Sequence, residues 1–240
     1  GLPADMPSIL HIGRCYQLPV LEDACQANGA RCLIDGRWQR VGSFGAAAVF
    51  SFSPSETKGA GREAGAVVTS DPGIASKIRW LRDRSSQGSC SRQSGSTSLE
   101  SRQAAALAEE LGTRDEMNRR RRRAADGYRE VLAGLPLSLP IEPEFAEHIY
   151  DLYVVRASDR DLLHTELAEA GVSAALYDNF PPHMQERLQQ HGYVNGDFPA
   201  FERWTATVLS LPMHPNLPPS QIQHIGAACR KILGTHAPNW

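Results

Sequence analysis

The 240-residue chain has few aromatic residues, few cysteines and no surplus of either charge. Aromatic side chains make up 7% of the residues, and 25 basic groups stand against 27 acidic ones, which gives a net charge of -2. A chain so close to neutrality has no general attraction to nucleic acid or to an anionic membrane, so we expect neither as a partner. Its 41% of hydrophobic residues suffices for a core and indicates one large or two small folded domains.

Disulfide, metal and membrane signals are also missing. The five cysteines are odd in number and include no CxxC pair, which disfavours a disulfide framework and a zinc site. The eight histidines show neither HExxH nor a paired ligand spacing, so we predict no metal centre. No stretch approaches the roughly 20 apolar residues of a membrane helix, and residues 1–10 lack the basic and apolar regions of a secretion signal. We therefore expect a cytoplasmic protein.

Generic nucleotide and hydrolase motifs are absent as well. Gly59 and Gly61 are followed by Gly65, one residue too far for GxGxxG, and the GK[ST] sequence of a phosphate loop does not occur. A Ser/His/Asp triad stays open, although no GxSxG elbow supports it. The chemistry must therefore be sought in a less generic pattern.

Alternating helix and strand patterns fill the first half of the chain. They predict helices over 7–16 and 71–82, and strands over 18–21, 46–52 and 66–69. Ser70 or Asp71 is expected to cap the second of these helices. Glu22 and Asp23 follow the first strand, at the end of a strand where α/β folds bind ligands. Such alternation is typical of an α/β layer fold.

The middle of the chain combines a polar loop with a long helix. The Ser/Gly-rich residues 84–98 are too many for a simple connection and indicate a functional or a mobile loop. A helical pattern then extends over 99–135, with an expected break near Gly112. Within it, the five arginines 119–123 have acidic neighbours, which favours a solvated helix face over a nucleic-acid patch.

A proline-rich segment at 135–145 indicates a linker, which divides the chain into a first domain over 1–134 and a second over 135–240. The pattern of the second part is typical of a small α+β domain. Its expected elements are a strand over 150–157, a helix over 159–170, a strand over 173–177, and helices over 201–209 and 220–233.

Several motifs follow one another along the chain in a specific order. They are LPVLEDACQANGA at 18–30, VGSFGAAAVFSFSPS at 41–55, GAVVTSD at 65–71, HIYDLYVV at 148–155 and LSLPMHP at 209–215. In this order they resemble the DegT/StrS-type sugar aminotransferases, which are pyridoxal-phosphate enzymes of fold type I that place an amino group on nucleotide-linked keto sugars. The resemblance implies an α/β fold, namely the latter part of a three-layer α/β/α large domain followed by a small α+β domain.

The resemblance assigns three residues to the cofactor. Asp23 matches the carboxylate that keeps the ring nitrogen protonated, a role that calls for burial beside the ring. Gln26 matches the residue near the 3-oxygen of the ring. Ser51 matches the hydroxyl that binds the phosphate, where a short hydrogen-bond donor is suitable. The ordinary alternatives are a capping acid, a polar turn residue and a strand serine.

The same resemblance reveals a departure at the nucleophile. In the family, the lysine that holds the cofactor as a Schiff base lies two residues after the proline of FSF-x-P. Here that position is Glu56. A carboxylate cannot form an imine, so we predict no transamination by this chain and leave its catalytic residues unassigned. Lys58 is offset by roughly 7 Å along an extended loop, and we interpret it as a surface lysine.

The chain enters the family pattern only after its opening third, so we expect the remaining large-domain parts on another segment or chain, or else a fragment. Three interpretations stay open. The first is a homologue without catalytic activity that forms a homodimer or pairs with an active aminotransferase. The second is an active or altered pyridoxal-phosphate enzyme for nucleotide sugars that uses Lys58 or Glu56. The third is a fragment without function.

Overall fold

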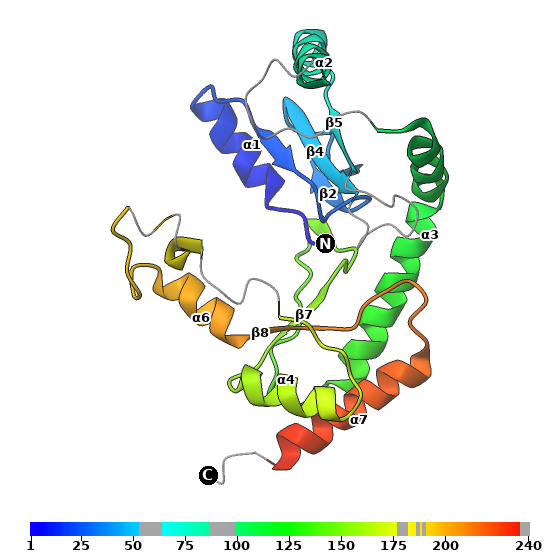
Figure 1. The fold of residues 1–240 in the computed structure, drawn as a ribbon, viewed down its shortest axis with the longest axis vertical. Helices are drawn as coiled ribbons and strands as arrows, with labels where there is room; N and C mark the ends of the chain where they lie inside the picture. Colours follow the sequence, from blue (N-terminus) through cyan, green and yellow to red (C-terminus); the bar gives the residue numbers. More distant parts are fainter. Residues whose placement is uncertain (53–63, 87–98, 177–181, 186–187, 189–190, 236–240) are drawn as a thin grey trace. The chain divides into compact units, whose positions relative to one another are not determined.

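The computed structural model describes residues 1–52, 64–86, 99–176, 182–185, 188 and 191–235 (Figure 1). Contacts between Cα atoms divide the chain into two compact units. Unit 1 holds Gly1–Arg119 and Glu142–Ile149, and unit 2 holds Arg120–Ile141 and Tyr150–Trp240. Each unit has a cluster of buried hydrophobic residues of its own.

Unit 1 is built from short strands and from helices. Its elements in chain order are α1 (Met6–Cys15), β1 (Leu21–Asp23), β2 (Arg31–Ile34), β3 (Arg37–Arg40), β4 (Ala47–Phe52), β5 (Ala64–Val68), α2 (Pro72–Ser86), the first part of α3 (Ser101–Val131) and β6 (Ala146–Glu147). The Asp71 carboxylate accepts a hydrogen bond from the Gly73 amide at 2.6 Å and so caps α2, as the sequence predicts. The order agrees with the predicted succession of a helix, a group of strands and a second helix, and adds β2 and β3 to the strands.

The position of α1 depends on its two ends. The Asp5 carboxylate accepts a hydrogen bond from the Ser8 amide at 3.1 Å, which satisfies a free donor of the first turn. Near the other end, Gly13 faces the segment that leads into β1, and a Cβ atom at Gly13 would lie 2.8 Å from Val20 Cγ2. The helix therefore approaches this segment through a residue that has no side chain.

The strands of unit 1 form two sheets. In the first, with order β1-β4-β5, β1 runs parallel to β4 and β5 runs antiparallel to it (Figure 1). In the second, with order β3-β2-β6, neighbouring strands are antiparallel. The pairing of β2 with β6 explains why Glu142–Ile149, which is distant in sequence, belongs to unit 1.

The β2–β3 hairpin adds to the predicted elements. Its two turn residues, Asp35 and Gly36, have φ angles of 49° and 74°. A two-residue turn with both central residues at positive φ is typical of tight hairpins, and Asp-Gly is a sequence that favours it. The sequence therefore carries a hairpin signal at this point.

Unit 2 contains the second part of α3 followed by the remaining elements. In chain order these are β7 (Tyr153–Arg156), α4 (Arg160–Glu169), the short 3-10 helix η1 (Pro182–Met184), α6 (Pro199–Thr207), β8 (Val208–Leu211) and α7 (Pro219–Thr235). β7 and β8 pair antiparallel, and α4 and α7 lie side by side (Figure 1). The buried cluster of unit 2 draws residues from α3, β7, α4, β8 and α7.

Four predicted elements differ from the structure. The first strand, expected over 18–21, spans Leu21–Asp23, so Glu22 and Asp23 lie within it instead of after it. The expected break near Gly112 is wrong, because α3 continues through it; a single glycine costs only about 1 kcal/mol, which the rest of this 31-residue helix outweighs. The expected strand over 173–177 is reduced, within the described residues, to an isolated bridge between Ala175 and Ser210. The helix expected over 201–209 ends at Thr207, because Val208–Leu211 pairs with β7 as a strand.

We predicted a solvated helix face for the five arginines, but not all of them lie on such a face. Arg121 is 6% exposed and lies 3.9 Å from the Asp151 carboxylate. Arg119 is exposed and pairs with Glu116 at 2.8 Å. Successive helix residues point in different directions, so one member of any five-residue run must turn toward the core.

Candidate cofactor site

Two of the residues assigned to the cofactor lie on neighbouring strands and on the same face of the first sheet. In the parallel pairing of β1 with β4, Asp23 is the partner of Val49. Ser51 lies two residues beyond Val49 on β4, and residues two apart on a strand share a face. The register therefore brings Asp23 and Ser51 together at the carboxyl ends of these two strands.

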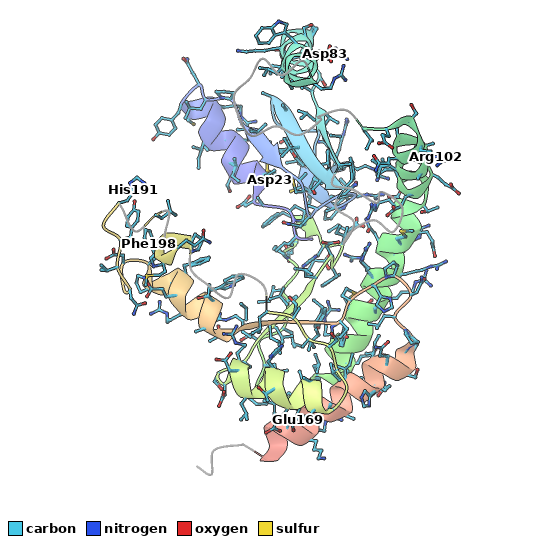
Figure 2. The ribbon with its side chains drawn as sticks, in the orientation of Figure 1. Asp23, Asp83, Arg102, Glu169, His191 and Phe198 are labelled. Atoms are coloured by element: carbon cyan, nitrogen blue, oxygen red, sulfur yellow. The ribbon has the colours of Figure 1, made fainter. Side chains whose placement is uncertain are left out.

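Asp23 ends β1 with an exposed carboxylate (Figure 2). Its Oδ1 atom accepts a hydrogen bond from the Cys25 amide at 3.1 Å. The hydrogen bonds from Cys25 lower the pKa of Asp23, so the carboxylate is held as an anion. We expected this carboxylate to be buried, but no described residue covers it.

Gln26 lies in the turn that follows β1. Its side chain is exposed, whereas Ala24, two residues before it, and Ala27, directly after it, are buried. The Ala27 amide donates to the Ala24 carbonyl at 3.0 Å, which closes the turn. Gln26 thus stands on a fixed backbone within three residues of Asp23.

Ser51 lies in the middle of the first sheet. It is half-buried on β4 and pairs with Gly65 of β5. A Cβ atom at Gly65 would lie 3.0 Å from the Phe50 carbonyl oxygen, so a glycine at this position lets the two strands approach closely. Glu56 and Lys58, on which the predicted chemistry depends, lie outside the described residues.

Glu22, which the sequence analysis leaves unassigned, fixes the loop beneath the site. Its side chain is 6% exposed, and its carboxylate accepts hydrogen bonds from the amides of Gly42, Phe44 and Gly45 at 2.7, 2.6 and 2.7 Å. The loop comes so close that a Cβ atom at Gly45 would lie 2.4 Å from the Val20 carbonyl oxygen. The signal in the sequence is the pair of adjacent acids at the end of a strand, of which only one can face a ligand.

The sequence matches the DegT/DnrJ/EryC1/StrS aminotransferase family over residues 1–230. The chain belongs to this family. Its fold agrees with that assignment, because the DesV structure from Streptomyces venezuelae superposes with a TM-score of 0.84 at 34% identity. That superposition covers 95% of this chain and 62% of DesV.

Two curated members of the family illustrate the similarity. The chain is 37% identical to the UDP-N-acetyl-3-dehydro-alpha-D-glucosamine 3-aminotransferase of Acidithiobacillus ferrooxidans, over 97% of this chain and 62% of the relative. It is 34% identical to the dTDP-3-amino-3,4,6-trideoxy-alpha-D-glucose transaminase of Streptomyces venezuelae, over 96% of this chain and 61% of the relative. The chain thus spans about three fifths of the length of the curated relatives that it matches.

Aminotransferases of the DegT/DnrJ/EryC1/StrS family depend on pyridoxal phosphate, and the residues on the β1–β4 face fit its ring and phosphate. The anionic Asp23 carboxylate suits a protonated pyridine nitrogen, and the Ser51 hydroxyl can donate a hydrogen bond to a phosphate oxygen. Gln26, which is exposed in the turn after β1, offers an amide to the ring substituents.

A second polar cluster lies in unit 2 and has a structural role. The imidazole Nε2 of buried His183 lies 3.0 Å from Glu202 Oε1, and the same carboxylate accepts from the Gly196 amide at 2.9 Å. The Gly196 amide is the main cause of the lowered pKa of Glu202. The cluster ties the segment before α6 to the first turn of that helix.

A cavity of about 480 Å³ lies in unit 2, lined by Leu135, Pro136, Leu137, Ser138, Arg156, Ala157, Ser158 and Thr207. In the part of the chain that the structure describes, no group of three or more His, Cys, Asp or Glu side chains could hold a metal ion. Among those same residues, no helix is long and apolar enough to cross a membrane.

Proposed function

We propose that this chain is a pyridoxal-phosphate-binding homologue of the nucleotide-sugar aminotransferases that does not itself transaminate a keto sugar. The observation that carries the cofactor assignment is the register of β1 and β4, which puts Asp23 and Ser51 on one face of the sheet. The names of the curated relatives, which act on UDP- and dTDP-linked sugars, support the substrate class.

Each of the three residues has one task in this proposal. Asp23 keeps a proton on the ring nitrogen through its negative charge, which the Cys25 amide stabilises. Ser51 donates to the phosphate, and Gln26 orients the 3-oxygen side of the ring. When bound and linked to a lysine amine, the cofactor supplies an electron sink for amino-group transfer.

The absence of transamination is proposed from Glu56, which stands where the family has its lysine. A carboxylate has no nitrogen with which to hold the cofactor covalently, and its negative charge repels the phosphate. The chain would then bind the cofactor reversibly. Its partner in such a role is a second copy of itself or an active homologue, and catalysis would come from the latter.

Borohydride reduction followed by peptide mapping tests the proposed lack of a covalent link. Incubated with pyridoxal phosphate and reduced, the wild-type chain is expected to carry no label on any lysine, whereas Glu56→Lys gains a label at position 56. The double variant Glu56→Lys with Lys58→Arg is the control, because it should keep the label at position 56. A label at Lys58 of the wild-type chain would overturn the proposal and favour an active enzyme that uses this lysine.

Equilibrium dialysis of pyridoxal phosphate tests the cofactor face independently of the covalent link. Asp23→Asn and Ser51→Ala are each expected to weaken binding about tenfold or more, the usual loss for a charged hydrogen bond. Ser76→Ala, at an exposed position on α2, is the matched control and leaves binding unchanged. Equal affinity for all four proteins, or no binding by the wild-type chain, contradicts the assignment of Asp23 and Ser51.

A further inference from the structure

A thiol and an imidazole lie one helical turn apart on α1, outside the candidate cofactor site. Cys15 Sγ lies 3.6 Å from His11 Nε2, and both side chains are exposed. Residues four apart on a helix share a face, so the helix itself holds the two groups side by side. The cofactor chemistry proposed above makes no use of either residue.

The separation of the two atoms matches the spacing of two ligands on one metal ion. Zinc binds thiolate sulfur at about 2.3 Å and imidazole nitrogen at about 2.0–2.1 Å, and at a tetrahedral angle these bonds place sulfur and nitrogen about 3.5 Å apart. We propose that His11 and Cys15 form a two-ligand chelating site on α1 for a soft divalent metal ion such as Zn²⁺ or Co²⁺. The site follows from a mixed His-x-x-x-Cys spacing, which a search for paired histidines misses.

The surroundings of the pair select the class of metal. The last turn of α1 contains no carboxylate, and its charged residue is Arg14. Mg²⁺ and Ca²⁺ prefer carboxylate oxygens, and the side chains of this turn offer none. Sulfur and imidazole nitrogen favour zinc and the later first-row metals instead. On binding, the Cys15 thiol releases its proton to solvent, sulfur and Nε2 each donate an electron pair to the metal, and water fills the remaining positions.

The other described thiols do not compete for such an ion. Cys32 and Cys229 are both 0% exposed. Loss of hydration raises the pKa of both thiols, that of Cys229 to about 11, so neither forms a thiolate readily. Cys25 is half-buried and serves as the matched control for Cys15.

Titration with Co²⁺ under a phosphine reductant tests the site, because a cobalt–thiolate bond gives a charge-transfer absorption band. The wild-type chain is expected to show this band, and added Co²⁺ is expected to raise its melting temperature. His11→Gln and Cys15→Ser should each weaken binding about tenfold or more, since loss of a ligand costs at least as much as loss of its supporting partner. Cys25→Ser and His214→Gln should leave the affinity unchanged.

A ligand exchange separates chelation from a general effect on the helix. The double substitution His11→Cys with Cys15→His keeps the four-residue spacing and is expected to retain the band, although each single substitution at these positions weakens it. A band that survives Cys15→Ser overturns the proposal. So does an affinity that His11→Gln leaves unchanged, or loss of the band in the exchanged variant while circular dichroism shows intact helix. The test does not involve pyridoxal phosphate, so it stands or falls separately from the proposed function.

Discussion

Glu22 and Asp23 are adjacent acids on β1 with opposite environments. Glu22 is 6% exposed and surrounded by three backbone donors, whereas Asp23 is exposed and accepts from Cys25. Successive residues of a strand face opposite sides of the sheet, so one acid supports the loop and its neighbour is left free for a ligand. The geometry of the cofactor face thus depends on a residue that points away from it.

Glu22→Gln is expected to lower the free energy of unfolding by about 1–3 kcal/mol, because the carboxamide NH2 group would face a backbone N–H and leave a buried donor unsatisfied. Asp23→Asn, the same isosteric change one residue away, should alter it by less than about 0.5 kcal/mol, since its side chain is exposed. Urea unfolding followed by circular dichroism measures both. Equal losses in the two variants would contradict the supporting role of Glu22.

The sequence predicts the place of these acids better than their tasks. An apolar run followed by two acids predicts a strand that ends before the acids, but β1 spans Leu21–Asp23 and contains both of them. Which acid turns inward depends on the loop before β4, whose amides at Gly42, Phe44 and Gly45 donate to Glu22. Such a contact between residues about 20 positions apart has no local pattern.

At the scale of elements, one ion pair connects the β2–β3 hairpin to α3 within unit 1. Both guanidinium nitrogens of Arg40 donate to the two carboxylate oxygens of Asp115, at 2.8 and 2.6 Å. This hydrogen bonding lowers the pKa of Asp115 and raises that of Arg40. Two parallel bonds fix the orientation of both side chains, so the pair links the end of β3 to the helix.

The stabilisation by Asp115 should depend on pH. Because its folded-state pKa lies below the unfolded value of 3.8, the contribution is present above that pH and is lost as the pH falls through the folded value. We expect Asp115→Asn to cost about 0.2–1 kcal/mol near neutral pH, the range for exposed pairs, and nothing in strong acid. Urea unfolding of both proteins at the two pH values measures this. A difference that persists in strong acid would show that the pair acts through packing.

The elements missed or misjudged from the sequence share a physical cause. The local sequence predicts a helix over 201–209 and a strand over 173–177, but the pairing of Val208–Leu211 with β7 decides which residues become a strand. Tertiary pairing overrides weak propensity in such short segments. In contrast, the Asp-Gly turn of the β2–β3 hairpin carries a strong local signal that was available in the sequence.

At the scale of the whole molecule, α3 crosses the boundary between two units that have separate cores. Buried residues of its second part, including Tyr128 and Val131, belong to the cluster of unit 2, and the Tyr128 hydroxyl donates to the Pro212 carbonyl at 2.6 Å. The core of unit 1 is smaller and contains Ala24, Ala27, Ala30, Val41 and Ile149. The predicted division between residues 134 and 135 stays a prediction. A proline-rich segment indicates where the chain changes direction, but it says little about which core the residues on each side join.

The separate cores predict that damage to one unit stays local. Leu167 on α4 is fully buried in unit 2, so Leu167→Ala is expected to cost about 2–5 kcal/mol through lost burial and the cavity left behind. Hydrogen exchange measured by mass spectrometry should then quicken in α4 and α7, while β1 and β4 keep their wild-type protection. Leu162→Ala, half-buried on the same helix, is the control and should have a smaller effect. Equal quickening in β4 would mean that α3 couples the two units into one cooperative structure, and the cofactor face would then depend on the core of unit 2.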